Sequence, residues 1–209
     1  MPSTPKGRNE KGKYRNKHGE FKARVRRLVP LEPDSDVLEL FAGDGVLYRA
    51  VWHAAGRGAT CDLEDSCVRL AARERPHWTV LKANADRVLR GGLWLDRPFD
   101  VVDIDCYGSP WKFLAAFFCR PRALPPVCHL FLTDNYMINR NLSHEDLVLG
   151  FRKPGTTDEY LAAVDRLLEK LVAPAGYRCD RKLYRQDRCV QHLVTLSRAG
   201  PSAATGTRG

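Results

Sequence analysis

The feature that most constrains this fold is a regular alternation of short apolar runs with helical segments between residues 37 and 136. Each of the first four runs is followed by a stretch that is compatible with a helix. Strands that alternate with helices in this way form a parallel sheet covered by helices on both faces. The five runs are residues 37–43, 58–64, 78–84, 99–105 and 128–136.

The last third of the chain has a different pattern. Residues 156–177 carry apolar side chains at helical spacing, with Thr157 and Asp158 as caps. Residues 177–185 and 189–198 are strand-like and are separated by a short turn, which predicts an antiparallel hairpin. The predicted fold class is therefore α/β, with a doubly wound, seven-stranded, mostly parallel sheet that ends in this C-terminal hairpin.

The positive charge of the chain is concentrated at its N-terminus. Residues 1–29 hold ten Lys or Arg and two acidic residues, a net charge of +8. Of the 34 basic and 25 acidic residues in the chain, 24 and 23 remain in residues 30–209, a net charge of +1. Such a cluster of cations favours binding to a phosphate backbone by counterion release, and the alternative is a solvated tail. The candidate nucleic-acid-binding residues are Lys11, Lys13, Arg15, Lys17, Lys22, Arg26 and Arg27.

The sequence divides into three parts of different composition. Within the first part, residues 21–29 can form a short helix with Phe21, Val25 and Leu28 on one face. The last eleven residues are small and polar, which is typical of a disordered tail. The predicted parts are a basic, partly helical N-terminal arm (1–29), a folded domain (30–198) and the tail (199–209).

Composition also limits the surroundings of the protein. No stretch approaches the ~20 apolar residues that span a bilayer, and the start of the chain is charged where a signal peptide would be apolar. The seven cysteines are odd in number and form no paired C-x-x-C motif. None of the six histidines forms a metal-like pair. We therefore expect a cytoplasmic protein with reduced thiols, without a metal and without a membrane partner.

A glycine loop follows the first predicted strand, in the segment ELFAGDG. In an open α/β sheet, ligands bind at the carboxyl ends of the strands, where this loop lies. A dinucleotide fingerprint needs a third glycine where this chain has Tyr48, and Asp44 would repel a pyrophosphate. The loop therefore favours a ligand without phosphate, and another nucleotide remains the alternative.

The same segment resembles the first motif of class I S-adenosylmethionine-dependent methyltransferases, and the order of elements extends the resemblance over residues 36–198. It implies a Rossmann-like fold with S-adenosyl-L-methionine as the cofactor. The implied cofactor contacts are Glu39 and the backbone of Phe41, Gly43 and Gly45 for the methionine group, Asp62 for the ribose, and Ala85 and Asp86 for the adenine. Glu64 and Asp65 are alternatives to Asp62 for the ribose.

The fourth predicted strand ends at the same edge of the sheet in the segment DIDCYGSP. We take Asp105, Cys106 and Tyr107 as its catalytic candidates. Asp103 points to the same face as Asp105 and is placed with the cofactor-binding residues, because it could support Asp105 or the cofactor amine. Ser109 and Pro110 are typical of a helix entrance, with a capping hydroxyl before a proline at the first helical position.

The chemistry of an amine acceptor explains these residue types. An exocyclic amine on a base is a poor nucleophile because its lone pair is delocalised into the ring. The Asp105 carboxylate and the Cys106 carbonyl could accept its two hydrogens and aim the lone pair at the methyl donor. Tyr107 could stack on the base once it has left its own stack. Alignment of this kind can contribute roughly 7–11 kcal/mol to catalysis.

FDVVDIDCYGSP also resembles the corresponding segment of the tRNA guanine-N2 dimethyltransferases, typically Asp-Pro-(Phe or Tyr)-Gly-Ser-Pro, with Cys106 in place of the proline. As an alternative, Cys106 could be a thiolate that attacks a pyrimidine ring. The neighbouring Asp105 disfavours this, because an adjacent carboxylate raises the pKa of a thiol.

Together these features predict methyl transfer to an exocyclic amine of a nucleic-acid base, most simply guanine N2 in structured RNA such as tRNA. Asn135 and Tyr136, after the fifth strand, are candidates to touch this acceptor. The alternatives are a DNA amino-methyltransferase, a non-catalytic nucleic-acid-binding protein on the same scaffold and, less favoured because it would not need the arm, a small-molecule methyltransferase.

Overall fold

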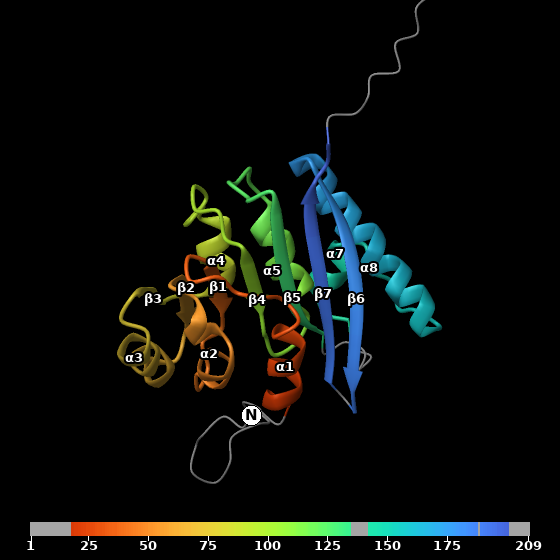
Figure 1. The fold of residues 1–209 in the computed structure, drawn as a ribbon. Coiled ribbons are helices and arrows are strands. Elements are labelled where there is room, and N and C mark those ends of the chain that lie inside the picture. Colours follow the sequence, from red (N-terminus) through yellow and green to blue (C-terminus); the bar gives the residue numbers. More distant parts are fainter. Residues whose placement is uncertain (1–17, 135–141, 188, 201–209) are drawn as a thin grey trace, which may run out of the picture.

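The computed structural model describes residues 18–134, 142–187 and 189–200. Its centre is a seven-stranded sheet with the order β3-β2-β1-β4-β5-β7-β6 (Figure 1). Strands β1 to β5 are parallel, and β7 is antiparallel to β5 and β6, which confirms the predicted fold class. The strands are β1 Asp36–Leu40, β2 Arg57–Asp62, β3 Trp78–Lys82, β4 Val101–Ile104, β5 Val127–Asp134, β6 Tyr177–Gln186 and β7 Cys189–Arg198.

Helices cover both faces of the sheet (Figure 1). One hydrophobic cluster joins the sheet to α1, α2 and η1, and a larger cluster on the other face joins it to α4, α5 and α8. The α-helices are α1 Gly19–Arg26, α2 Val46–Ala50, α3 Asp65–Glu74, α4 Ala85–Arg90, α5 Trp111–Phe118, α7 His144–Val148 and α8 Thr157–Val172. The short 3₁₀ helices are η1 Trp52–Ala54 and η2 Ala173–Ala175.

Alternation along β1 explains why the sheet has two cores. Side chains of a strand point to opposite faces in turn, so a strand buried on both faces is apolar throughout or carries paired polar groups. Leu38 and Leu40 belong to the larger cluster with α4, α5 and α8, whereas Val37 belongs to the smaller one. Glu39 shares the face of Val37 and is 2% exposed, so the smaller core must contain a partner for its carboxylate.

The switch in strand order places the candidate site between β1 and β4. The chain leaves β1 towards β2 and β3, then returns to β4 on the other side of β1. Leu40 and Ile104 are paired in register at the ends of these two strands. The glycine turn and the DCYGSP segment therefore leave the sheet side by side, where an open α/β sheet binds its ligands.

Helix α1, which lies within the predicted basic arm, packs against the sheet. Phe21, Val25 and Val29 are at most 7% exposed and pack in the smaller core. Leu28, which we expected on the apolar face of this helix, is 52% exposed because the helix ends at Arg26. The packing of the domain therefore begins with α1 rather than at residue 30.

Two helix caps also differ from the expected residues. Helix α8 is capped by Thr156, one residue before the expected caps, and Glu159 completes a capping box with it. Helix α5 has Pro110 at its N-cap, while the Ser109 hydroxyl accepts a long hydrogen bond of 3.4 Å from the Trp111 amide. Among the described helices, none has the length and apolar character needed to cross a membrane.

The packing of α1 predicts a sharp difference between two truncations. Deletion of residues 1–29 removes three large buried apolar side chains, each worth about 1.5–3 kcal/mol, and this loss rivals a total stability of about 5–15 kcal/mol. We expect this variant to lack a cooperative thermal transition by circular dichroism. Deletion of residues 1–17 leaves every described contact in place and should keep the melting temperature within about 5 °C, because the free energy of unfolding should change by less than about 1 kcal/mol. A folded 30–209 fragment would contradict this role of α1.

Candidate active site

The glycine turn after β1 is tightly connected to the end of β2. Phe41, Gly43 and Gly45 all have positive φ angles, of 70°, 53° and 73°. The Phe41 amide donates to the Cys61 carbonyl at 3.0 Å, and the Gly45 amide donates to the Ala42 carbonyl at 3.1 Å. These amides, expected at the methionine group, are therefore used within the protein. The cationic amine of such a group needs acceptors, which a turn offers through carbonyl oxygens.

Asp62 holds this turn in place. One of its carboxylate oxygens accepts from the Gly43 amide at 3.0 Å, and the other accepts from the Glu64 amide at 2.9 Å. A carboxylate has about four lone-pair sites, so Asp62 can still accept hydrogen bonds from a ribose. Asp65, one of its alternatives, forms an exposed ion pair with Lys82 at 2.7 Å.

The expected adenine contacts lie at the start of α4. Ala85 is buried as the first residue of this helix, and Asn84 caps it by accepting from the Arg87 amide at 3.1 Å. The Asp86 carboxylate accepts from the Arg90 side chain at 2.9 and 3.1 Å, in an exposed pair one helical turn apart. Ala85 and Asp86 thus lie beyond the end of β3, at the same edge as the glycine turn.

The centre of the sheet carries three carboxylates on the face that α1 and α2 cover. Asp103 of β4 and Asp105, one residue beyond β4, lie two residues apart and turn to this face, and Glu39 of β1 is paired in register with Asp103. Carboxylates so close together repel one another and are costly to bury unless cations neutralise them. The structure provides one cation for each, in the ion pairs Glu39–Arg75, Asp103–Arg26 and Asp105–Lys22.

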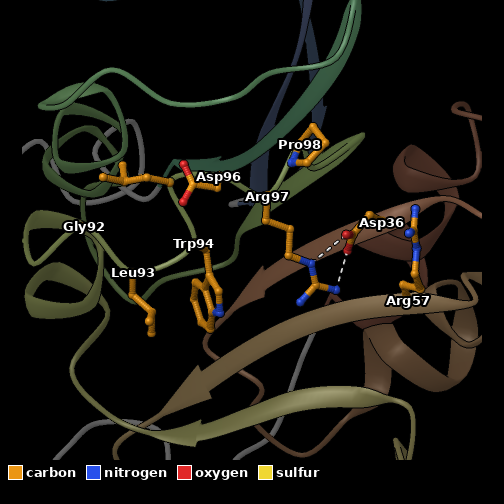
Figure 2. Close-up of a pocket in the computed structure, with 9 residues that line it drawn as sticks. Asp36, Arg57, Gly92, Leu93, Trp94, Asp96, Arg97 and Pro98 are labelled. Atoms are coloured by element: carbon orange, nitrogen blue, oxygen red, sulfur yellow. Dashed lines mark hydrogen bonds and ion pairs between the residues drawn. The ribbon is translucent and has the colours of Figure 1, made fainter.

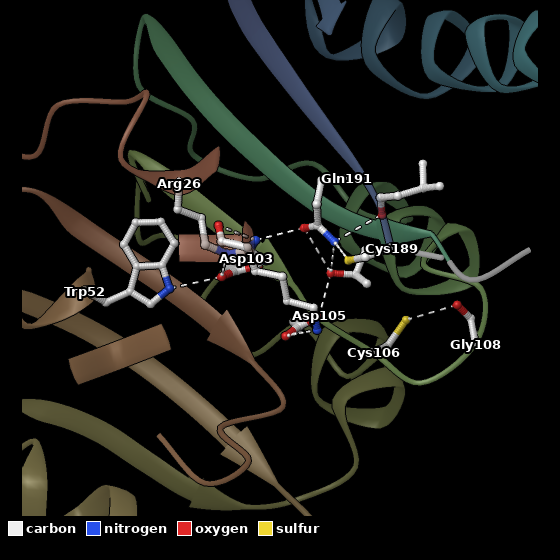
Figure 3. A network of polar contacts seen from close by, with 11 residues as sticks. Arg26, Trp52, Asp103, Asp105, Cys106, Gly108, Cys189 and Gln191 are labelled. Atoms are coloured by element: carbon white, nitrogen blue, oxygen red, sulfur yellow. Dashed lines mark hydrogen bonds and ion pairs between the residues drawn. The ribbon is translucent and has the colours of Figure 1, made fainter. Parts of the chain in front are cut away.

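The ion pair between Asp103 of β4 and Arg26 of α1 belongs to the core. The Arg26 guanidinium donates to both oxygens of Asp103, at 2.5 and 2.7 Å, and both side chains are fully buried (Figure 3). The Trp52 indole donates to Asp103 as well, at 3.0 Å. Asp103 was expected near the cofactor, but its carboxylate accepts from α1 and η1. Arg26 was expected to bind phosphate, but its side chain is fully buried and a phosphate cannot reach it.

Asp105 lies at the edge of the sheet, one residue beyond β4. Lys22 of α1 donates to its two oxygens at 2.6 and 2.8 Å, and the Thr133 hydroxyl of β5 donates at 2.6 Å. The Asp105 side chain is 11% exposed. Burial works against its ionised form, but the positive charges of Lys22 and Arg26 outweigh this and lower the pKa of Asp105. The carboxylate is therefore ionised at neutral pH and faces α1.

The two residues after Asp105 differ strongly in exposure. Cys106 is buried, and its thiol donates to the Gly108 carbonyl at 3.8 Å. Burial, together with the nearby Asp105, raises the pKa of the Cys106 thiol, so the structure disfavours a thiolate nucleophile. Tyr107 is 77% exposed, which suits a ring that stacks on a base. Gly108 turns the chain with a φ of 117°, an angle that favours glycine.

Three residues of the site were missed by sequence reasoning. Asp146, which is 1% exposed, accepts from the hydroxyl groups of Ser109 and Ser143 and so ties α7 to the DCYGSP segment. Thr133 and Gln191 are polar residues within apolar strands, and Gln191 donates to Thr133 at 3.0 Å. For Thr133 and Gln191, the available signal in the sequence was a polar residue within an apolar strand, but this signal does not identify the residue's partner.

The remaining predicted residues lie at the surface or outside the described residues. Arg27 is the C-cap that follows α1, is half exposed, and pairs with Glu20 at 3.0 Å. Glu64 precedes α3. The candidates outside the described residues are Lys11, Lys13, Arg15, Lys17, Asn135 and Tyr136.

Two further features of the described residues bear on ligands. No group of three or more metal-ligating side chains comes together in residues 18–134, 142–187 and 189–200. A cavity of about 480 Å³ is lined by Asp36, Arg57 and residues 92–98 (Figure 2). Asp36 and Arg57 begin β1 and β2, so this cavity lies at the opposite edge of the sheet from the glycine turn. Two of its lining residues, Arg97 and Asp36, form two hydrogen bonds with each other, of 2.6 and 2.7 Å.

Comparison with known proteins identifies the fold. No protein-family model and no curated protein sequence matches this chain. Among solved structures, TYW2 of M. jannaschii in complex with AdoMet has a TM-score of 0.57 at 12% identity, over 88% of this chain and 78% of that one. Ribosomal protein L11 methylase of Lactobacillus delbrueckii has a TM-score of 0.53 at 15% identity, over 90% and 81%. The O-methyltransferase TomG of Streptomyces achromogenes, in complex with SAM, has 0.53 at 16%, over 89% and 81%.

The chain thus has the class I methyltransferase fold, as its sheet order and these similarities show. The similar structures carry names that refer to different acceptors, so the fold alone does not select one.

The third ion pair joins Glu39, near the end of β1, to Arg75, which follows α3. Arg75 donates to Glu39, and both side chains are at most 2% exposed. The guanidinium also lies over the rings of Tyr48 and Trp78, at 4.4 and 5.3 Å from their centroids. Burial disfavours the ionised carboxylate more than Arg75 favours it, and raises the pKa of Glu39 to about 7. Glu39, expected at the methionine group, is instead buried in the core with its carboxylate toward Arg75.

This pair predicts unequal costs for its two single substitutions. In Glu39→Gln, a guanidinium that cannot lose its proton is left buried without a counterion, which costs about 3–5 kcal/mol. In Arg75→Met, Glu39 can become neutral by taking up a proton, so the loss at pH 8, where the wild-type carboxylate is ionised, should be smaller. Urea unfolding at pH 8 measures both variants, and the double variant should recover part of the loss. Equal losses in the two single variants would contradict this prediction.

The same variants test the linkage between Glu39 and pH. Because the pKa of Glu39 is raised from 4.5 to about 7 in the folded protein, the folded state holds the proton more tightly. Its contribution to stability is complete below pH 4.5 and is lost as pH rises through about 7. Arg75→Met, which removes the cation that lowers this pKa, should therefore go on losing stability above pH 7, where the wild type levels off, and Glu39→Gln should lack this slope.

Proposed function

We propose that this protein is an S-adenosylmethionine-dependent methyltransferase that acts on an exocyclic amine of a nucleic-acid base, with guanine N2 in structured RNA such as tRNA as the first candidate. The observation that carries the proposal is the pairing of Leu40 with Ile104, which brings the glycine turn and the Asp105–Tyr107 segment together at one edge of the class I fold. The DIDCYGSP segment supports an amine acceptor through its resemblance to the guanine-N2 enzymes.

The residues of this edge suit the proposed cofactor. Asp62 retains acceptor capacity for the ribose, and Ala85 and Asp86 stand beyond the next strand for the adenine. When bound, S-adenosyl-L-methionine supplies a methyl group on a cationic sulfur. Glu39 takes no direct part, because its carboxylate faces Arg75.

Asp105 would orient the acceptor. Lys22 and Thr133 occupy three of the approximately four lone-pair sites of its carboxylate, which leaves one to accept a hydrogen from the amine. Its lowered pKa makes it a weak base, so it holds and aims the amine, and the proton released after transfer passes to solvent. Tyr107, exposed beside it, would stack on the base.

Substrate identity can be tested with a labelled methyl donor. The purified protein is incubated with the donor and, separately, with total RNA and total DNA, and the products are digested to nucleosides for mass spectrometry. We expect label in RNA, on a purine amine. Label in DNA would support the DNA amino-methyltransferase. Absence of donor binding by calorimetry would support a non-catalytic scaffold.

The role of Asp105 predicts the effect of Asp105→Asn, which preserves the size of the side chain beside Lys22. Removing the carboxylate should lower kcat by about 100-fold or more, as for other groups that align or stabilise a transition state. The affinity for S-adenosyl-L-methionine should change little, because Asp105 is not among the proposed cofactor contacts. Full turnover in this variant would remove Asp105 from the mechanism.

The proposed nucleic-acid partner predicts a salt effect of the N-terminal residues. Deleting residues 1–17 removes Lys11, Lys13, Arg15 and Lys17 but leaves the described packing unchanged. The slope of log affinity against log salt should fall by about 0.7–0.9 for each phosphate that the shortened protein no longer neutralises. Fluorescence anisotropy with a labelled RNA at several salt concentrations measures this slope. An unchanged slope would favour a solvated tail.

A further inference from the structure

Two cations of α1 match in spacing two carboxylates at the end of β4. Lys22 and Arg26 are four residues apart on the helix, a rise of about 6 Å. Asp103 and Asp105 are two residues apart on the chain, a span of about 6.6 Å in a strand. Lys22 therefore meets Asp105 at 2.6 and 2.8 Å. Arg26 meets Asp103 at 2.5 and 2.7 Å (Figure 3).

A second set of contacts fixes this arrangement from the other side. Arg26 donates to the Gln191 side-chain carbonyl at 2.8 Å, and the Gln191 amide donates to the Thr133 hydroxyl at 3.0 Å. Thr133 in turn donates to Asp105. Strands β5 and β7 and helix α1 thus hold the one carboxylate of this cluster that lies at the edge of the sheet.

We propose that Lys22 is a positioning residue of the methyl-transfer reaction, which holds Asp105 as an oriented, ionised hydrogen-bond acceptor for the amine. This inference rests on the proposed function and changes the role expected for Lys22, from binding phosphate to supporting the catalytic carboxylate. An ionised Asp105 accepts hydrogen bonds only, whereas a protonated one would donate and compete with the amine.

The surroundings of Asp105 explain why Lys22 is needed. The charged or titratable groups that face it within the described residues are Lys22 and Arg26 of α1, Asp103 and Cys106 of its own segment, and Cys189 of β7. Arg26 is already bound to Asp103, and Asp103 repels the charge of Asp105. Without Lys22, a carboxylate that is 11% exposed would gain a proton far more easily.

The test compares Lys22→Met with Arg24→Met. Arg24 lies on the same helix, is exposed, and donates to Gln186 at 3.3 Å rather than to Asp105, so its substitution removes the same charge without this contact. We expect Lys22→Met to move the acid limb of the kcat profile to higher pH by at least about one unit, which lowers kcat about tenfold or more at pH values below the wild-type midpoint. Lys22→Arg should restore most of the acid-limb position and most of kcat. Arg24→Met should leave the midpoint of the acid limb in place.

Two further measurements make the result independent of folding and of the substrate. The double variant Lys22→Met/Asp105→Asn removes both charges, and its cooperative unfolding would show that the site tolerates the shorter side chain. Carboxyl-carbon NMR of the full chain follows the titration of Asp105 directly, with and without Lys22. We expect its midpoint to rise in Lys22→Met and not in Arg24→Met.

The outcomes separate this inference from the proposed function. If Lys22→Met changes only the affinity for nucleic acid and its salt dependence, with the acid limb and the Asp105 titration unchanged, Lys22 is a phosphate contact and the inference is wrong. Faster turnover in Lys22→Met would also overturn it. If the wild type transfers no methyl group but the Asp105 titration moves as expected, the proposed function fails while the coupling of Lys22 to Asp105 stands.

Discussion

Burial of three carboxylates on one face of the sheet centre is the constraint on which the rest of this structure depends. Glu39 of β1, Asp103 of β4 and Asp105, one residue beyond β4, lie close enough to repel one another. Burial removes the water that would otherwise stabilise each carboxylate, so each needs a cation at hydrogen-bond distance. Two of these cations come from α1, which explains why a helix in the most basic part of the chain is packed into the core.

The pairs differ in exposure, and their roles follow this difference. Asp103 with Arg26 is fully buried, and Glu39 with Arg75 is almost so, which restricts both pairs to holding helices against the sheet. Asp105 with Lys22 is partly exposed and lies where the strands end. An ion pair in this position keeps a charged acceptor in place while leaving it accessible to a ligand, as a methyltransferase acting on an amine would require.

Much of the fold could be predicted from the sequence because its signals are local. The alternation of strand and helix periods indicated the sheet, and the glycine turn and the DIDCYGSP segment indicated the edge where ligands bind. The errors concerned contacts at a distance. Arg26 was predicted to bind nucleic acid at the surface, but it is fully buried. Leu28 was predicted on the apolar face of the helix, but it lies beyond the end of the helix and is exposed. Nothing within the segment around α1 shows that its basic residues face acids on β4.

The sequence by itself determined the order of the elements, the seven-stranded sheet and the positions of the candidate site residues, because periodicity and turn residues act over a few neighbouring positions. Only the tertiary structure decided which cation meets which carboxylate. Lys22 and Asp105 are 83 residues apart, and Arg26 and Asp103 are 77 apart. Such pairs form when packing brings distant segments together and excludes water, and no local pattern of side chains encodes that event.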